Sequence, residues 1–243
     1  MSAARASERA RVAAGLSLVE MLIGIAIGLF IVAGATLVLT TQLNDNRRLL
    51  LEVQVQQDLR SAADIVTREL RRAGYSNTAS QGVYTPSRPV ARNGMTALST
   101  DVGGSGSGLM FNYQRESGAE NFGFKVDGGV IKTKLAGSTG WQDLTDANTV
   151  RITDFTITPQ NGPAVQVSCP KACPAPTGAL PAGTTAENYC WPTFMVRDLV
   201  ITIAGQAVSD PAVERSLRSI VRLRNDSVQF NANPADPDQA CPA

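Results

Sequence analysis

One uninterrupted apolar run, residues 16–39, constrains this chain more than any other part of its sequence. Glu20 is the only charged residue within that run. At a rise of about 1.5 Å per residue, a helix of this length is long enough to cross the hydrocarbon core of a membrane. An ionised carboxylate inside such a helix costs several kcal/mol unless a partner neutralises it. The position of Glu20 therefore predicts a partner for its side chain.

The residues that precede the run are mostly small or charged, and they include Arg5, Arg9 and Arg11. A basic flank of this kind remains on the cytoplasmic side, so we expect the rest of the chain to lie across the membrane. Gly15 stands before the apolar run and not after it. A cut after Gly15 would therefore retain the helix, unlike the cut that removes an ordinary secretory signal.

The six residues from Gly15 to Glu20, Gly-Leu-Ser-Leu-Val-Glu, resemble the class III signal of type IV prepilins. The resemblance implies that prepilin peptidase, a membrane aspartyl protease, cuts after Gly15 and that the new amino terminus at Leu16 is methylated. Leu16 departs from the usual first mature residue, which is Phe. The resemblance also implies that Glu20 pairs with the terminal amine of a neighbouring subunit, which is the kind of partner that burial of a carboxylate requires.

Two simpler interpretations of Glu20 remain open. Ser17 and Glu20 have the spacing of a capping box, in which the glutamate satisfies backbone donors at the start of a helix. Alternatively, the run is a plain signal anchor in which the glutamate has no role. In the same run, Gly24 and Gly28 form a G-x-x-x-G pair, a pattern that lets another helix approach closely.

Beyond residue 39 the sequence continues, without a break, as an amphipathic helix. Two arginines followed by Gly74 indicate where that helix ends. We therefore expect one long helix over residues 16–73, with its first part, 16–39, in the membrane or filament core and its second half packed on a sheet. The expected apolar stripe recurs every three or four positions, at Leu51, Val55, Leu59, Ala62, Val66, Leu70 and Ala73.

Two further blocks narrow the resemblance. The string Arg71-Arg72-Ala73-Gly74-Tyr75 resembles the end of the long helix in PilW-type minor pilins, and residues 219–225, Ser-Ile-Val-Arg-Leu-Arg-Asn, are similar to the last strand of that group. The blocks lie far apart but in the order that the group has. J-type pseudopilins of type II secretion share the N-terminal block and the general layout, so they remain the alternative.

Strand-like alternation dominates the second half of the chain. Expected strands cover residues 109–114, 121–126, 130–135, 150–158, 164–168, 194–204 and 216–224, with a hairpin turn at Asp127-Gly128-Gly129. Residues 76–108 are rich in Ser, Gly, Thr and Pro and indicate a flexible surface loop. The expected fold is α+β and type IV pilin-like: a cleaved leader (1–15), the long helix (16–73), and a periplasmic domain (74–243) whose mostly antiparallel sheet, in two parts, packs on the helix.

The four cysteines are Cys169, Cys173, Cys190 and Cys241. An even number in an exported domain predicts two disulfides, and three connectivities are possible. We favour Cys169 with Cys173 and Cys190 with Cys241, because the second bond would hold the C-terminal tail. A metal site at the first two cysteines is the alternative, but the chain has no His. Residues 231–238 gather oxygen ligands without the spacing of an EF-hand, so we expect neither a metal nor a cofactor.

Several function classes find no support in the sequence. Without His there is no catalytic triad, and no nucleophile elbow or phosphate-binding loop occurs, so we do not expect an enzyme. Lys and Arg number 22 against 21 Asp and Glu, a balance that does not favour nucleic-acid binding. The last expected strand and the residues beside it carry four arginines, which we expect on the solvated face of the strand: Arg215, Arg218, Arg222 and Arg224.

The resemblance implies a minor pilin of a type IV pilus that serves motility and attachment. We expect it to cross the inner membrane once, with its C-terminal domain in the periplasm, and to be cut by prepilin peptidase. It would then assemble with other minor pilins and the major pilin into a priming or tip complex at the cell surface. The alternatives are a minor, J-like pseudopilin of a type II secretion system and a membrane-anchored periplasmic binding domain.

Overall fold

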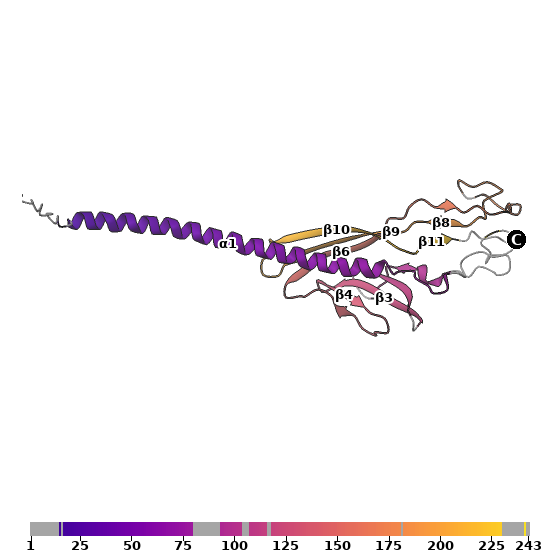
Figure 1. Ribbon diagram of the computed structural model, residues 1–243, viewed down its shortest axis with the longest axis horizontal. Helices are drawn as coiled ribbons and strands as arrows, with labels where there is room; N and C mark the ends of the chain where they lie inside the picture. Colours follow the sequence, from indigo (N-terminus) through magenta and orange to yellow (C-terminus); the bar gives the residue numbers. More distant parts are fainter. Residues whose placement is uncertain are drawn as a thin grey trace, which may run out of the picture. The chain divides into compact units, whose positions relative to one another are not determined.

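A computed structural model describes residues 15, 17–79, 93–103, 107–115, 118–180, 182–229 and 241 of the chain (Figure 1). The chain divides into two compact units, Met1–Leu49 and Leu50–Ala243. Helix α1, Leu18–Leu70, contributes residues to both units. The expected helix over residues 16–73 is confirmed apart from its ends, because residues 71–74 form a turn and Leu16 lies outside the described residues.

The first unit consists, in its described part, of the N-terminal half of α1 and the residues just before it. Every described side chain from Gly15 to Leu49 is exposed. This half contains a stretch that is long and apolar enough to cross a membrane, and none of that stretch is buried within the chain. Its apolar surface is therefore available to a lipid bilayer or to other helices.

The second unit begins with the C-terminal half of α1, which buries one face. The buried residues confirm the stripe expected from the sequence, and they are Val55, Leu59, Ala62, Ala63, Val66 and Leu70. Leu51 packs against the same core and is only partly buried. The opposite face of this half carries exposed polar residues such as Arg60 and Asp64.

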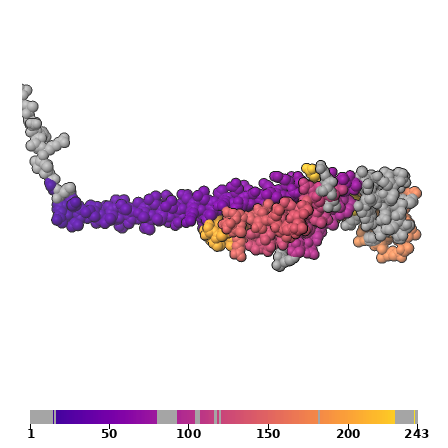
Figure 2. Space-filling view, turned by 90° about the horizontal axis from the view of Figure 1, so that it is seen from below, coloured from indigo at the N-terminus to yellow at the C-terminus, as the bar shows by residue number. Residues whose placement is uncertain are grey.

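Within its described residues the second unit also contains three antiparallel sheets and, before them in the chain, the short helix η2, Gly94–Thr96. The first sheet has the strand order β1 (Leu98–Ser99), β2 (Gly108–Arg115), β3 (Gly118–Asp127), β4 (Val130–Lys134), β5 (Gln142–Asp143). The second has the order β10 (Glu214–Arg222), β9 (Asp198–Ala207), β6 (Val150–Pro159). The third has the order β11 (Ser227–Gln229), β8 (Thr193–Met195), β7 (Val165–Gln166). In Figure 2 the pink and coral atoms, whose colours correspond to the part of the chain that contains the first sheet, form much of the visible coloured surface of this unit.

One hydrophobic core joins α1 to the first and second sheets. It combines residues such as Leu59 from α1, Phe111 and Phe124 from the first sheet, and Phe155 and Ile201 from the second. Close approach to α1 explains the glycine at position 205 of β9, because a Cβ there would lie 3.3 Å from Cδ2 of Leu59 and 3.0 Å from Cγ2 of Val150. The helix and its two sheets thus form the α+β architecture that the sequence predicts.

Two expectations about the strands need correction. The apolar segment 194–204 does not form one strand, because β8 belongs to the third sheet and β9 to the second. In the part of the chain that the structure describes, the strands form three sheets and not two, and the third sheet is built from strands of two or three residues. Strands this short do not establish a periodic pattern in sequence, which is why β1, β5 and β11 were not expected.

The four cysteines form two disulfides, but with a different pairing from the one that we favour from sequence. Cys169 is bonded to Cys241, and Cys173 is bonded to Cys190. The backbone explains the second pair, because the Cys173 amide donates to the Glu187 carbonyl over 2.8 Å and so folds the intervening segment back on itself. The C-terminal tail is held, as expected, but through Cys169.

Candidate functional site

The residues that the sequence marks for processing and assembly lie at the start of α1, in the first unit. Gly15 is exposed, and Leu16 lies outside the described residues. The amide of Met21 donates to the Ser17 carbonyl over 3.1 Å, which places Ser17 just before the first turn. Glu20 lies within that turn, with its side chain exposed.

Nothing in the described part of the chain satisfies the Glu20 carboxylate. Among those residues no hydrogen bond joins the Ser17 hydroxyl to the backbone of the first turn, so the capping-box geometry is not present there. The Glu20 carboxylate forms neither an ion pair nor a hydrogen bond with any described residue. A carboxylate in this apolar setting still requires a partner from outside the described chain.

Glu20, Gly24 and Gly28 follow one another at intervals of four residues, so they lie along one side of α1. A Cβ added at Gly24 or at Gly28 would meet no heavy atom within 4 Å. The side of the helix that carries the carboxylate is therefore also the side on which a second helix can come closest. The four-residue spacing of these three positions is already present in the sequence.

A second candidate site lies where α1 ends, in the second unit. Gly74 has a positive φ of 79°, a conformation that terminates the helix and that glycine adopts without strain. Its amide donates to the Asn112 carbonyl over 2.9 Å, and the Gln114 amide donates to the Tyr75 carbonyl over 2.8 Å. Residues 71–75, which we call the helix-end turn, are thus hydrogen bonded along β2.

Two asparagine side chains complete the attachment of the helix-end turn. Nδ2 of Asn93 donates to the Gly74 carbonyl over 2.8 Å, and Nδ2 of Asn225 donates to the Ala73 carbonyl over 3.1 Å. The second bond joins the two sequence blocks that resemble PilW-type pilins, residues 71–75 and 219–225. The structure therefore brings these distant blocks together at one place. Sequence reasoning identified each block but not their contact.

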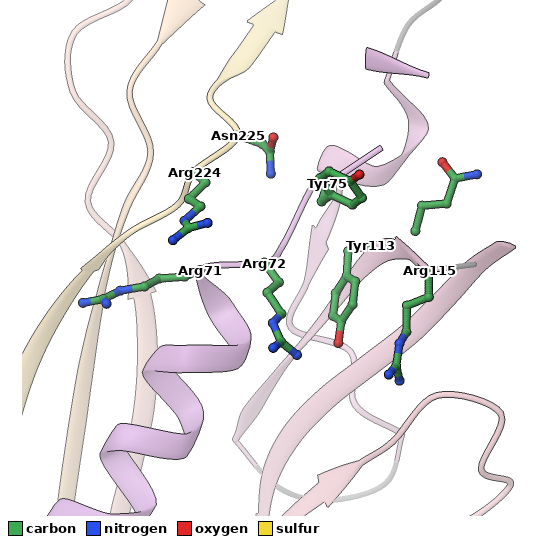
Figure 3. Close-up of a pocket in the computed structure, with 8 residues that line it drawn as sticks. Arg71, Arg72, Tyr75, Tyr113, Arg115, Arg224 and Asn225 are labelled. Atoms are coloured by element: carbon green, nitrogen blue, oxygen red, sulfur yellow. The ribbon is translucent and has the colours of Figure 1, made fainter. Parts of the chain in front are cut away.

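A cleft of about 420 Å³ opens beside the helix-end turn (Figure 3). Four of the residues that line it are arginines from three separate segments: Arg71 and Arg72 follow α1, Arg115 ends β2, and Arg224 follows β10. The other lining residues are Tyr75, Tyr113, Gln114 and Asn225. We call this feature the arginine cleft. The sequence offered no direct signal for it, because its arginines are not adjacent in the chain.

One arginine of the cleft belongs to a hydrogen-bonded network with buried Tyr113. The Tyr113 hydroxyl donates to Oε2 of Glu69 over 3.0 Å, and Nη1 of Arg72 donates to Oε1 of the same glutamate over 3.2 Å. The Tyr113 ring stacks on Phe122 with ring centroids 3.9 Å apart. Burial is the main reason why the pKa of Tyr113 is raised, and the hydrogen bond to Tyr113, followed by the charge of Glu69, raises the pKa of Arg72.

The remaining residues considered from sequence do not form a common site. In the described part of the chain no three His, Cys, Asp or Glu residues cluster as they would around a metal ion. Residues 231–238, which we considered for calcium, lie outside the described residues. The arginines near β10 do not act as one surface, since Arg215 forms an ion pair with Glu52 whereas Arg222 forms one with Asp226.

The chain matches the model of a known protein family. The family model of prepilin peptidase-dependent protein B matches residues 48–223, well over half of the chain. The matched region includes the helix-end turn and β10, and it begins after the segment that contains Gly15 and Glu20. No curated protein and no solved structure matches the chain.

Proposed function

The chain belongs to the prepilin peptidase-dependent protein B family, and from this premise we propose that it is a PilW-like minor pilin that primes assembly of a type IV pilus. Membership of the family implies processing by prepilin peptidase and a pilin-like structural role. The pilin-like α+β architecture and the membrane-compatible helix agree with that role. One observation carries the finer proposal, namely the carboxylate of Glu20 on an otherwise apolar and open side of α1.

Processing would begin with a cut after Gly15, which gives Leu16 a free α-amine that is then methylated. The leader would stay in the cytoplasm, α1 would remain in the inner membrane, and the second unit would lie in the periplasm. Removal of the leader would leave the new amine a few residues from Glu20. Each processed subunit would therefore present one cation and one anion close together in an apolar environment.

Assembly would follow from neutralisation of these two charges between subunits. The Glu20 carboxylate of one subunit would pair with the terminal amine of a neighbour, which reduces the cost of burying both groups. Gly24 and Gly28 would allow the neighbouring helix to approach on the same side. The apolar half of α1 would then move from lipid into the filament core without exposure to water. The neighbours would be other minor pilins and the major pilin, first in a priming complex and then at the pilus tip.

The intact mass and the N-terminal peptide of the protein recovered from its native membranes test the processing step. We expect a mature chain that starts at Leu16 and carries one methyl group. A chain that starts at Met1 or Ser2, or that is cut after residue 39, would contradict the proposal. The membrane-anchored periplasmic binding domain would then be the better description.

The variant Glu20→Gln tests the assembly step, because it removes the charge and keeps the shape of the side chain. We expect this variant to be inserted and cut as the wild type is, but to be depleted at least about tenfold from sheared pili, as loss of a buried charge pair predicts. Asp45→Asn is the matched control, since Asp45 is an exposed carboxylate of the same helix outside the apolar run. Incorporation of Glu20→Gln at the level of this control would disprove the assembly mechanism.

Deletion of the gene separates the pilus from the secretion alternative. A minor pilin predicts loss of surface pili and of twitching motility, with protein export unchanged. A J-like pseudopilin of type II secretion predicts the reverse pattern. The fold does not discriminate between these two, because the resemblance extends to both groups.

A further inference from the structure

We propose that the arginine cleft binds a carboxylate-rich segment of a partner protein. The ligand class is an acidic peptide, and the groups that would bind it are the guanidinium groups of Arg71 and Arg224, which line the cleft together with Tyr75. Figure 3 shows these two arginines on the same side of Tyr113, opposite Arg115. This site is separate from Glu20 and from the membrane-compatible half of α1. The proposal therefore goes beyond pilus assembly and does not depend on it.

The charges of the cleft are not balanced by the described part of the chain. Arg72 is neutralised by Glu69 at 3.2 Å, whereas Arg115 is 3.9 Å from Glu120 and its side chain is 56% exposed. Among the described residues, Arg71 and Arg224 form no ion pair. Two cations thus line one cleft without an anion, and a carboxylate placed between them would gain charge-assisted hydrogen bonds to both.

The backbone around these arginines is held in place before any ligand arrives. Arg71 is the first residue of the helix-end turn, which is bonded to β2 and to the side chains of Asn93 and Asn225. Arg224 stands between Leu223, which is 1% exposed, and Asn225, which bonds to Ala73. A preorganised site spends less of its binding energy on ordering its own groups, so this attachment favours binding.

The carboxylate of Asp226, two residues after Arg224 in the sequence, already has an ion-pair partner. Asp226 follows Asn225, but its Oδ2 lies 3.6 Å from Nη2 of Arg222. Burial lowers the pKa of Arg197, and the negative charge of Asp226 opposes that shift. Asp226 therefore already interacts with Arg222 and Arg197. A carboxylate for Arg71 and Arg224 must come from elsewhere.

Geometry and charge favour an acidic peptide over a nucleic acid. The chain as a whole is almost neutral, with a formal charge of +1, so the positive charge is a local property of the cleft. Two arginines of β10, Arg215 and Arg222, already have acidic partners. A nucleic-acid surface needs an extended row of free cations to follow the phosphates. The cleft instead offers the forked donors of Arg71 and Arg224, which suit carboxylates, and the exposed ring of Tyr75, which can cover aliphatic parts of a peptide.

Binding can be measured on the full-length protein in detergent with a fluorescent hexaglutamate peptide as the probe. Hexaglutamine is the matched uncharged peptide, and a single-stranded oligonucleotide is the competitor that represents the other class of ligand. The test variant is Arg71→Gln combined with Arg224→Gln. The control variant is Arg218→Gln, because Arg218 is an exposed arginine of β10 that does not line the cleft.

We expect the double variant to weaken hexaglutamate binding by at least about tenfold, and Arg218→Gln to leave it unchanged, because two charge-assisted hydrogen bonds are lost only in the first. Equal affinity for hexaglutamine, or an unchanged affinity in the double variant, would overturn the proposal. So would stronger competition by the oligonucleotide than by unlabelled hexaglutamate. Tighter binding after Asp236→Asn and Asp238→Asn would show that the chain's own tail is the occupant, which would also overturn it. None of these results depends on cleavage at Gly15 or on Glu20.

Discussion

Nδ2 of Asn225 donates a hydrogen bond of 3.1 Å to the carbonyl oxygen of Ala73, which lies 152 residues earlier in the chain. Ala73 follows the end of α1, where carbonyl groups lack partners within the helix. Ala73 is fully buried, so water does not donate a hydrogen bond to its carbonyl oxygen. One asparagine side chain therefore connects the end of the helix to the segment that follows β10.

Replacing Asn225 by Ala should lower the free energy of unfolding by about 1–3 kcal/mol, because the Ala73 carbonyl would be left buried without a donor. Urea denaturation of the purified protein, followed by tryptophan fluorescence, measures this change. Asn77→Ala is a suitable control, since the Asn77 side chain is exposed. Equal stability of the two variants would mean that the bond contributes nothing to the fold.

Gly74→Ala should destabilise the protein by roughly 1–3 kcal/mol, because residue 74 has a φ of 79° that a residue with a Cβ adopts only with strain. The added Cβ would also lie 3.1 Å from Cβ of Asn225. Gly94→Ala provides the comparison, since a Cβ there would meet nothing within 4 Å and the residue has no positive φ. Thermal unfolding of both variants gives the measurement, and a loss of stability in Gly94→Ala as large as that in Gly74→Ala would contradict the explanation.

The two disulfides should contribute unequally to stability. Cys169 and Cys241 close a loop with a sequence separation of 72, whereas Cys173 and Cys190 are separated by 17. If chain entropy dominates, replacing the first pair by Ser should cost about 4 kcal/mol and replacing the second about 3 kcal/mol. Denaturation of the two double variants tests the order, and peptide mapping without reduction tests the pairing. A bond between Cys169 and Cys173 would restore the pairing favoured from sequence.

Stability should fall at alkaline pH through Tyr113. Its pKa is raised above the ordinary value of 10.0, mainly by burial, so the folded state holds the phenolic proton more tightly than the unfolded chain does. The contribution of the protonated Tyr113 hydroxyl to the free energy of unfolding is complete below pH 10, and it is lost as the pH rises through the higher pKa of the folded state. The free energy of unfolding, measured from pH 8 to pH 11, should decline less steeply in Tyr113→Phe than in the wild type. Tyr75→Phe, at an exposed tyrosine, should retain the wild-type slope.

The long helix and the longer strands were predictable from sequence because they satisfy a period over many residues. The stripe from Val55 to Leu70 repeats often enough to identify one buried face of α1. The split between β8 and β9 was not predictable, because the apolar residues continue across it and periodicity does not record a change of sheet. The disulfide pairing was not predictable either, since it depends on how the segment between Cys173 and Cys190 folds back.

The site at the start of α1 could be predicted from sequence, whereas the arginine cleft could not. Gly15, Leu16 and Glu20 were proposed from sequence because their meaning depends on neighbours along the chain. The arginine cleft depends on residues from three separate segments, which only the fold brings together. Arg71 and Arg224 carry no local signal that relates one to the other. The hydrogen bond between Asn225 and Ala73 joins the two segments that carry these arginines.

The elements that bury the apolar stripe of α1 include strands that are synthesised long after the helix. The buried stripe of α1 leaves the ribosome first, while β9 and β10, which help to cover it, emerge near the end of the chain. The core around Leu59 therefore cannot close until almost the whole protein has been made. A truncated or stalled product would present the apolar face of α1 without the strands that cover it, and exposed apolar surface of this kind makes an incomplete chain prone to aggregation.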